Sequence, residues 1–266
     1  MILDRFKNAA RALVRVPPAG RNIIVLEDDT YVVSYPKSGN TWVRFLVANL
    51  MGALGAVDFK TIERLVPDIY EHSNGNLLRY SRPRVLKSHE YVDLRYPKVI
   101  YLVRDPRDVV VSYFHHARKF FRIEQDKSID EFVESFIAGR LNAYGSWGQH
   151  VGTWRLARGG EAEFMMIRYE DLQTHPTAEL AEIAAHLGVN ADENMIASCL
   201  ELSDFDRMKE MERNHGNRWI TLADTRKGMP FIREGRAGGW RDELKPDLAR
   251  RIESAWGDLM SDLGYL

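Results

Sequence analysis

The fold is decided by one stretch of the sequence, Tyr31-Val32-Val33-Ser34-Tyr35-Pro36-Lys37-Ser38-Gly39-Asn40-Thr41-Trp42-Val43-Arg44-Phe45-Leu46. Its β-branched and aromatic start, residues 30–33, predicts a short buried strand. Pro36 and Gly39 break that strand, and an apolar helix is expected over about residues 41–54. Between a strand and a helix N-terminus, unpaired backbone N–H groups converge and the helix dipole favours negative charge. Such a loop binds anions, and Lys37 adds a full positive charge to it.

The loop differs from the phosphate loop of nucleoside triphosphatases. That pattern, GxxxxGK followed by Ser or Thr, puts the lysine after the last glycine and beside the hydroxyl that holds magnesium. Here Lys37 precedes Gly39, and no second glycine lies upstream in the loop. A plain connection between strand and helix is the alternative, and the other motifs of the chain decide between the two.

Length and composition limit the function classes. The 266 residues fit one large α/β domain, 1–266, or at most two small ones. The net charge of −1 gives no global basic field, so nucleic acid is not an expected partner and an anionic ligand must be attracted locally. Cys199 is the only cysteine, which excludes an intrachain disulfide and a cysteine-based zinc site and indicates a cytoplasmic setting.

No stable membrane insertion is expected. Residues 1–22 read as a basic, mildly amphipathic surface helix without the apolar core of a signal peptide. The longest mostly apolar run, 42–57, is broken by Arg44 and Asn49 and is too short to cross a bilayer.

Strands and helices are expected to alternate along the chain. Further strands are predicted at 84–89, 98–104 and 163–169, the second as an apolar run typical of a strand buried on both faces. Helices are predicted at 58–71, 106–121, 129–136, 142–154, 177–187, 192–202 and 246–263, with a polar loop at 74–76. This order predicts a single α/β domain whose central parallel sheet carries helices on both faces. Ligands then bind at the carboxyl ends of the strands, and the irregular segment 203–240 is expected to cover them.

Three polar motifs follow the later strands or lie near the end of the chain. They are Lys87-Ser88-His89, Arg104-Asp105-Pro106-Arg107-Asp108-Val109-Val110-Val111-Ser112-Tyr113 and Phe231-Ile232-Arg233-Glu234-Gly235-Arg236-Ala237-Gly238-Gly239-Trp240. With the loop at 35–42, this set resembles the cytosolic-type sulfotransferases that use 3′-phosphoadenosine 5′-phosphosulfate (PAPS). The family loop reads Tyr-Pro-Lys-Ser-Gly-Thr-Thr-Trp, and seven of its eight positions match, with Asn40 in place of Thr. The resemblance extends through Tyr169-Glu170-Asp171-Leu172 and covers residues 31–240.

The resemblance implies a P-loop-like fold in which the first loop holds the 5′-phosphosulfate of PAPS. The residues in that role would be Lys37, Ser38, Gly39, Asn40 and Thr41. Trp42 would stack on the adenine, which Tyr169, Ser203 and Phe205 would also contact. The co-substrate would leave as adenosine 3′,5′-bisphosphate (PAP), and no metal is implied.

The resemblance also implies a pocket for the 3′-phosphate. Arg104 and Ser112, eight residues apart as in the family, would bind it, and Arg233 and Gly235 would close over it from the C-terminal segment. Residues 226–228 repeat the family's Arg-Lys-Gly triplet, but the register of the downstream glycines selects Arg233. Arginine suits this role because its guanidinium is planar and permanently charged.

The remaining residue types suit sulfuryl transfer to a hydroxyl. In an in-line displacement, charge grows on the oxygen that bridges to the leaving phosphate, and Lys37 is placed to stabilise it. The acceptor hydroxyl needs a base of near-neutral pKa, for which His89 is the candidate. Lys87, two residues earlier on an extended segment, points to the same side and can neutralise the sulfonate oxygens. Neither a metal nor a covalent intermediate is required.

Some alternatives remain open. A nucleotide-dependent kinase lacks support because the Gly-Lys-Ser/Thr pattern is missing, and a PAPS-binding module without turnover would need no base such as His89. His115 and His116 are read as structural because adjacent residues do not share a helical face. Glu234 stands where the family usually has Lys, which puts the strength of PAPS binding in doubt, and Gly239 stands where it usually has Asp. The acceptor is expected to be a small-molecule, sugar or lipid hydroxyl; the family's dimer motif is not recognisable after Trp240, so a homodimer is left open.

Overall fold

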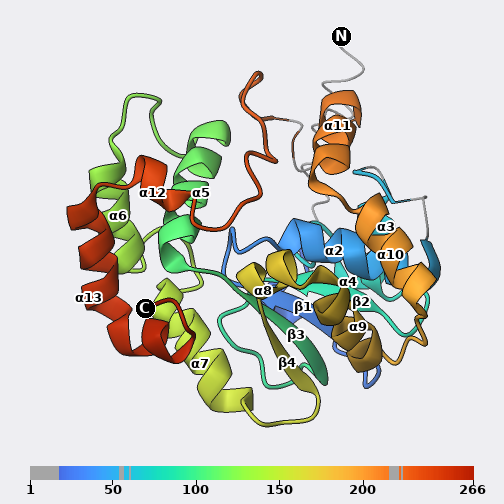
Figure 1. Cartoon of the computed structure of the whole chain (residues 1–266). Coiled ribbons are helices and arrows are strands. Elements are labelled where there is room, and N and C mark those ends of the chain that lie inside the picture. The colour runs from blue at the N-terminus through green and yellow to red at the C-terminus, as the bar shows by residue number, and fades with distance from the viewer. Residues whose placement is uncertain (1–17, 54–56, 60, 216–221, 223) are drawn as a thin grey trace.

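A computed structural model describes residues 18–53, 57–59, 61–215, 222 and 224–266. Its sheet contains four strands, β1 (Thr30–Ser34), β2 (Val85–Ser88), β3 (Lys98–Val103) and β4 (Phe164–Arg168), and every pair of neighbours is parallel. The order across the sheet is β2-β1-β3-β4 (Figure 1). Val33 is in register with both Ser88 and Tyr101, so the strands end together at one edge of the sheet. The predicted α/β domain with a parallel sheet is confirmed.

Helices connect the strands, as parallel pairing requires. In the first half of the chain they are η1 (Gly20–Asn22), α2 (Asn40–Ala48), the π-helical turn η2 (Asn49–Ala53), α3 (Ile62–Leu65), α4 (Asn74–Leu77) and α5 (Pro106–Lys119). In the second half they are α6 (Ile129–Ile137), α7 (Trp147–Arg158), α8 (Tyr169–Thr174), α9 (Pro176–Leu187), α10 (Glu193–Leu202), α11 (Phe205–His215), α12 (Trp240–Glu243) and α13 (Pro246–Asp262).

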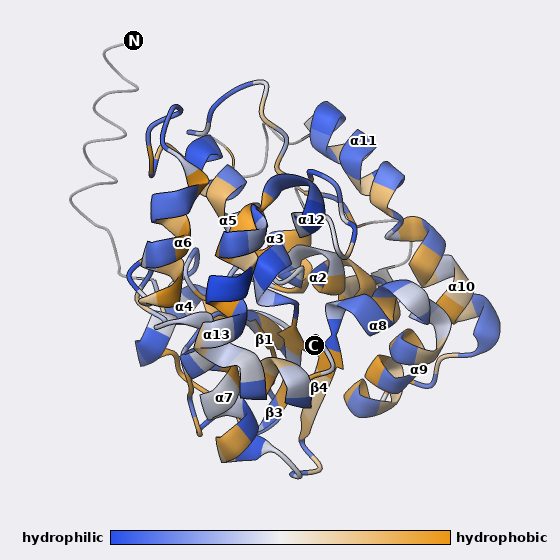
Figure 2. Cartoon of the chain, turned by 60° about the vertical axis from the view of Figure 1, so that its left-hand side comes forward, coloured by the Kyte–Doolittle hydropathy of each residue, from blue (hydrophilic) through white to orange (hydrophobic). Residues whose placement is uncertain are grey.

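The sheet is buried on both faces because its strands alternate between two apolar cores. Tyr31 and Tyr101 point into a core shared with α5, α6, α7 and α13, whereas Val32 and Ile100 point into one shared with α2, α9 and α10. Figure 1 shows these two groups of helices on opposite sides of the strands. In Figure 2 the hydrophobic colour is concentrated on strands such as β1 and β4, while α11 is largely hydrophilic.

Local capping signals placed several helices correctly. The side chain of Asp105 accepts a hydrogen bond from the N–H of Arg107, and Pro106 occupies the first helical position of α5. Gly188 ends α9 in the left-handed conformation, with φ of 72°. The strand and helix bounds predicted from residue 98 to 137 and from residue 163 to 202 differ from the observed ones by only a few residues.

The helix predicted over 58–71 is wrong for most of that range. Only α3 (Ile62–Leu65) is helical, and Val66 leaves the helix with φ of −133°. Pro67 explains the end of this helix, because proline disfavours the helical conformation in the residue before it. The extended residues that follow pair with Lys87 of β2. The polar loop predicted at 74–76 is also wrong, since Ser73 caps the short helix α4 there.

Two further segments differ from the predicted pattern. The helix predicted from residue 142 begins at Trp147, because Ser146 and Gln149 form a reciprocal capping box at its start. The segment 203–240 is not irregular throughout, since α11 occupies its first part. Phe205, Met208 and Met211 recur there with a spacing of three, a weak helical signal among charged residues. Of the basic helix predicted over 1–22, residues 1–17 lie outside the described residues. Residues 20–22 form η1.

Candidate active site

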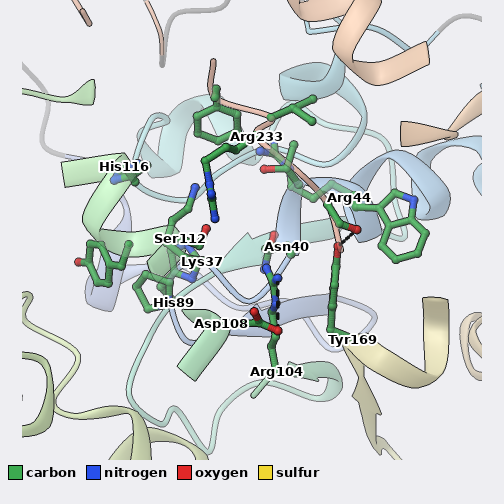
Figure 3. A pocket seen from close by; sticks show the side chains of 18 of the residues that line it. Lys37, Asn40, Arg44, His89, Arg104, Asp108, Ser112, His116, Tyr169 and Arg233 are labelled. Carbon is green, nitrogen blue, oxygen red and sulfur yellow. Dashed lines mark hydrogen bonds and ion pairs between the residues drawn. The ribbon is translucent and has the colours of Figure 1, made fainter. Parts of the chain in front are cut away.

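A cavity of about 810 Å³ lies where the four strands end. Its lining includes Lys37 from the loop after β1, and His89, Arg104 and Tyr169, which directly follow β2, β3 and β4. Arg233 reaches the same cavity from the C-terminal segment (Figure 3). The fold therefore brings together four motifs that lie far apart in the sequence.

The loop between β1 and α2 has a backbone that only particular residues can adopt. Lys37 has φ of 73° and Gly39 has φ of 102°, both in the left-handed region. A Cβ atom on Gly39 would lie 2.6 Å from the ring of Tyr169, so the position requires glycine for both reasons. For a lysine, this left-handed conformation costs free energy, and residues held in such conformations are concentrated at functional sites.

Two buried polar atoms in this loop have no hydrogen-bond partner among the described residues. They are the hydroxyl oxygen of Ser38, which is 1% exposed, and the side-chain oxygen of Asn40. The amide nitrogen of Asn40 donates to Ser34 Oγ at 3.1 Å and holds the side chain at the start of α2. Buried polar groups are normally satisfied, so unsatisfied ones beside a helix N-terminus indicate a place for a polar ligand.

The ammonium of Lys37 lies 4.4 Å from the centroid of the Phe231 ring. Burial, and then the nearby charges of Arg104 and Lys87, lower the pKa of Lys37 to about 7. An anion bound beside this ammonium would favour its charged form and offset the burial. The Lys37 ammonium is therefore better suited to contact with a negatively charged ligand than to apolar surroundings.

The ring of His89 is held in one tautomer by the backbone. Its Nδ1 lies 2.7 Å from the carbonyl oxygen of Ser34, which can only accept, so Nδ1 carries the hydrogen and Nε2 has a free lone pair in the neutral ring. Burial and the charge of Lys87 hold the pKa of His89 well below its usual value. The imidazole is therefore neutral near pH 7 with its lone pair at Nε2, and the lowered pKa makes it a weaker base than the near-neutral group expected from the sequence.

Lys87 forms an ion pair with Asp68, with 2.6 Å between Nζ and Oδ2. Both side chains line the cavity. The ammonium also lies 5.2 Å from the centroid of the Tyr70 ring, and the Tyr70 hydroxyl accepts a hydrogen bond from the backbone N–H of His89. The sequence motifs gave Asp68 and Tyr70 no role beside Lys87, because their approach to β2 depends on strand pairing that local patterns do not show.

Arg104 joins the strand ends to the C-terminal segment. Its guanidinium lies 4.3 Å from the centroid of the Tyr169 ring, and it donates to the carbonyl oxygen of Arg236 at 2.9 Å. Its Nε is buried without a partner among the described residues. Ser112, on helix α5, lines the same cavity. Asp108 fixes the segment further by accepting hydrogen bonds from the backbone N–H groups of Gly238 and Trp240.

The segment around Gly235 is packed against the cavity. Gly235 has φ of 67°, and a Cβ atom there would lie 2.1 Å from the ring of Phe205. Its carbonyl oxygen accepts a hydrogen bond from the Tyr169 hydroxyl at 2.8 Å. Arg233 pairs with Glu243 and, at 2.9 Å, with Glu234. Glu234, which replaces the family's usual Lys, also lines the cavity. Its carboxylate therefore lies beside the arginine expected to bind the 3′-phosphate.

The residues expected at the adenine fall into two groups. Trp42, Tyr169 and Phe205 line the cavity, and the rings of Trp42 and Tyr169 meet edge to face with centroids 5.6 Å apart. Ser203 is fully buried and does not line it. Its carbonyl oxygen accepts a hydrogen bond from Trp42 Nε1 at 3.1 Å. Ser203 therefore lies behind Trp42, and its contact with the adenine stays a prediction.

A family model described as the sulfotransferase domain matches residues 27–264. The chain belongs to the sulfotransferase domain family. It is a PAPS-dependent sulfotransferase, and the resemblance carried by the four motifs is confirmed.

Relatives cover most of the sulfotransferase. It is 31% identical over 259 residues to 3-beta-hydroxysteroid sulfotransferase of Cavia porcellus, across 91% of this chain and 86% of the relative. It is 30% identical over 254 residues to sulfotransferase 1E1 of Rattus norvegicus, across 88% and 84%. Among solved structures it is similar to mouse sulfotransferase SULT7A1 complexed with PAP, at 25% identity and a TM-score of 0.72, across 94% of this chain and 92% of that one.

The sulfotransferase cavity is also lined by residues that the motifs did not indicate. His116 lines it, with its ring stacked on Phe120 at 4.1 Å between centroids, and burial lowers the pKa of His116. His116 therefore lies at the cavity surface, and its interpretation as structural stays a prediction. Its spacing from Ser112 was the available signal, because residues four apart share one face of a helix. Tyr144 and Asn142 also line the cavity.

Two expected absences stay predictions. Within the described ranges, no group of three or more His, Cys, Asp or Glu side chains could hold a metal ion. No helix in those ranges is long and apolar enough to cross a membrane.

Proposed function

We propose that this sulfotransferase moves the sulfuryl group of PAPS to the hydroxyl of a small, partly apolar acceptor, with His89 as the general base. The observation that carries this proposal is the contact between His89 Nδ1 and the Ser34 carbonyl oxygen. It assigns the hydrogen to Nδ1, so Nε2 is the nitrogen available to an acceptor hydroxyl in the cavity that His89 lines.

The donor side of the proposal is supported by the unsatisfied polar atoms of the first loop. Ser38 offers a buried hydroxyl that can donate to a phosphate or sulfonate oxygen, and Arg104 offers a buried Nε that can do the same. Lys37 supplies the cation whose pKa of about 7 an anion would raise. These residues would hold the phosphosulfate and the 3′-phosphate, with Thr41 and Ser112 as the hydroxyl donors of each site. PAPS would supply the sulfuryl group and a phosphate leaving group.

The proposed proton transfer uses His89 and the two groups beside it. As the acceptor oxygen attacks sulfur, its proton would move to Nε2 of His89. The Ser34 carbonyl would stabilise the resulting imidazolium through its hydrogen bond from Nδ1. Lys37 would stabilise the charge that develops on the leaving phosphate oxygen, and Lys87 the charge of the sulfonate oxygens.

The acceptor would lie against aromatic side chains on the opposite side of the cavity. The rings of Tyr70 and Tyr144 lie with centroids 6.3 and 5.9 Å from that of His89, and Phe120 and Phe231 line the wall near Lys37. A ring-bearing phenol or alcohol suits these surroundings better than a highly charged compound, because aromatic walls favour apolar contact. A solved retinol dehydratase, 25% identical across 92% of this chain and 84% of that one with a TM-score of 0.73, holds retinol and PAP.

The proposal is tested by incubating the purified protein with sulfur-labelled PAPS and a panel of phenols, primary alcohols, sterols and sugars. The expected result is a labelled sulfate ester of a ring-bearing hydroxyl compound, formed together with PAP. Label transferred only to sugars would contradict the acceptor class. Tight PAPS binding without transfer to any acceptor would indicate a nucleotide-binding module instead.

A further inference from the structure

Asp68 reaches the cavity through strand pairing. The backbone N–H of Lys87 donates to the carbonyl oxygen of Pro67 at 2.9 Å, and the N–H of Ile69 donates to the carbonyl oxygen of Lys87 at 3.2 Å. Residues 67–69 therefore lie beside β2 as a short parallel neighbour, in which Asp68 is the partner of Lys87. Paired residues on neighbouring strands project to the same side, so the carboxylate lies beside the ammonium.

Both carboxylate oxygens of Asp68 are used. Oδ2 accepts from Lys87 Nζ at 2.6 Å, and Oδ1 accepts from the backbone N–H of Tyr70 at 3.0 Å. The Tyr70 hydroxyl in turn accepts from the backbone N–H of His89 at 3.1 Å and donates to Glu90 at 3.0 Å. One carboxylate thus contacts Lys87 directly and supports, through Tyr70, the backbone of His89.

The negative charge of Asp68 opposes the binding of an anionic nucleotide in the cavity. The cavity is lined by the cations Lys37, Lys87, Arg104 and Arg233, which suit an anionic nucleotide. A carboxylate among them weakens the attraction for that nucleotide, because like charges repel. With side chains only 11% and 12% exposed, the Lys87–Asp68 pair is also costly to bury. The Asp68 carboxylate is therefore better explained by a role in positioning the Lys87 ammonium than by a contribution to nucleotide affinity.

We infer that Asp68 is a positioning residue for sulfuryl transfer: it holds the ammonium of Lys87 by one N–H, so that the others are directed at the sulfonate, at the expense of nucleotide affinity. The inference rests on the proposed function, because it needs Lys87 to act on the sulfonate. It differs from a merely structural ion pair in a measurable way. Loss of a structural pair weakens binding and lowers turnover together, whereas loss of a positioning carboxylate lowers turnover without weakening binding.

The test is Asp68→Asn in the full chain, which removes the charge and keeps the shape. The dissociation constant of PAP is measured by calorimetry, and kcat with labelled PAPS and 2-naphthol, benzyl alcohol or cholesterol, whichever the wild type sulfates fastest. We expect kcat to fall by at least about tenfold, because a misplaced group of this kind costs that much or more. The dissociation constant of PAP is expected to fall by about two- to fivefold, as a carboxylate near the anion is removed. An unchanged kcat, or weaker PAP binding, would overturn the inference.

A double-mutant cycle with Lys87→Gln shows whether Asp68 acts through Lys87. In that background, Asp68→Asn is expected to cause no further loss of kcat, and independent, additive losses would overturn the inference. Asp93→Asn is the matched control, because Asp93 forms an ion pair of the same 2.6 Å length with Arg95 outside this cavity. Its kcat and PAP affinity are expected to match the wild type.

Asp68→Glu covers the case in which Asp68→Asn does not fold. It keeps the counterion but displaces the ammonium by about one methylene, so we expect lower kcat with unchanged PAP affinity, and a wild-type kcat would overturn the inference. Failure of the proposed function and failure of the inference about Asp68 give different results. A wild type that sulfates none of the three acceptors overturns the proposed function and this inference with it, whereas an active wild type matched by Asp68→Asn overturns the inference alone.

Discussion

The carbonyl oxygen of Ser34, the last residue of β1, lies 2.7 Å from Nδ1 of His89, which directly follows β2. These strands are neighbours in the sheet, and Val33 and Ser88 are in register. The orientation of the candidate base is therefore fixed by the pairing of two strands and not by a flexible loop. Rigid elements hold reacting groups more accurately than loops do.

His89→Asn is expected to lower kcat by roughly 10²–10⁴-fold, the usual contribution of a general base. PAP affinity is expected to stay within a few-fold of the wild type, because the proposed role of His89 concerns the acceptor. Turnover is measured with labelled PAPS, and affinity by calorimetry. His175→Asn, at an exposed histidine before α9, is the control and is expected to be fully active. Wild-type turnover of His89→Asn would remove the assignment of the base.

The proposed 3′-phosphate pocket predicts a strong preference for PAP over ADP. Arg104 and Arg233 would each form a charge-assisted contact with the 3′-phosphate, worth roughly 1.5–3 kcal/mol, so the two together give on the order of a hundredfold or more. Arg104→Gln is expected to lose most of that preference while ADP affinity changes little. Equal calorimetric affinities of the wild type for PAP and ADP would refute the pocket.

The pKa of about 7 for Lys37 predicts that PAP binding weakens as the pH rises. Burial, with the charges of Arg104 and Lys87, favours the neutral amine, so the free protein loses the Lys37 proton as pH rises through 7. The bound anion restores the charged form, and binding between pH 7 and 9 therefore takes up a proton. Calorimetry in two buffers of different ionisation enthalpy measures this uptake. Lys37→Met is expected to bind weakly with no proton uptake, and a wild type without uptake would contradict the assignment.

The parts of the site that follow strands were predictable from the sequence. Lys37 lies in the loop after β1, and His89, Arg104 and Tyr169 directly follow β2, β3 and β4. Parallel strands bring their carboxyl ends to one edge. Their local motifs therefore carried enough information to place them together. The same holds for Asp105 and Pro106, whose capping role depends only on neighbouring residues.

The parts that depend on contacts between distant segments were not predictable. Asp68 was assigned to a helix, and its pairing with β2 emerges only in the folded chain. The hydrogen bond from Trp42 to the Ser203 carbonyl oxygen was likewise not indicated by the sequence, and the contact of Ser203 with the adenine stays a prediction. Glu243, one of the two carboxylate partners of Arg233, belongs to α12, which begins at the last residue of that motif. Sequence spacing gives no measure of such tertiary contacts.

Gly235→Ala is expected to weaken PAP binding without lowering the overall thermal stability by more than a few degrees. A Cβ atom there would lie 2.1 Å from Phe205, so either the ring or the segment 233–236 must move away from the cavity. Gly228→Ala is a matched control, because Gly228 also has positive φ, of 80°, but nothing lies within 4 Å of its Cβ position. Both variants bear the cost of a left-handed alanine, about 1 kcal/mol, and only Gly235→Ala adds the clash. Equal PAP affinities of the two variants would show that the packing of Phe205 on Gly235 does not shape the site.

Glu234 is placed to compete with the nucleotide for Arg233. Its Oε1 lies 2.9 Å from Arg233 and its Oε2 3.2 Å from Arg236, at the wall of the cavity. Glu234→Gln removes this charge, which leaves Arg233 with Glu243 as its remaining carboxylate partner among the described residues. PAP is expected to bind several-fold more tightly, because a partly exposed pair of this kind is worth about 1 kcal/mol or less. The gain is expected to be smaller for ADP, which lacks the 3′-phosphate, and to shrink at high salt because exposed charges are screened. An equal gain for PAP and ADP would mean that Glu234 acts on the whole cavity and not on the proposed 3′-phosphate pocket.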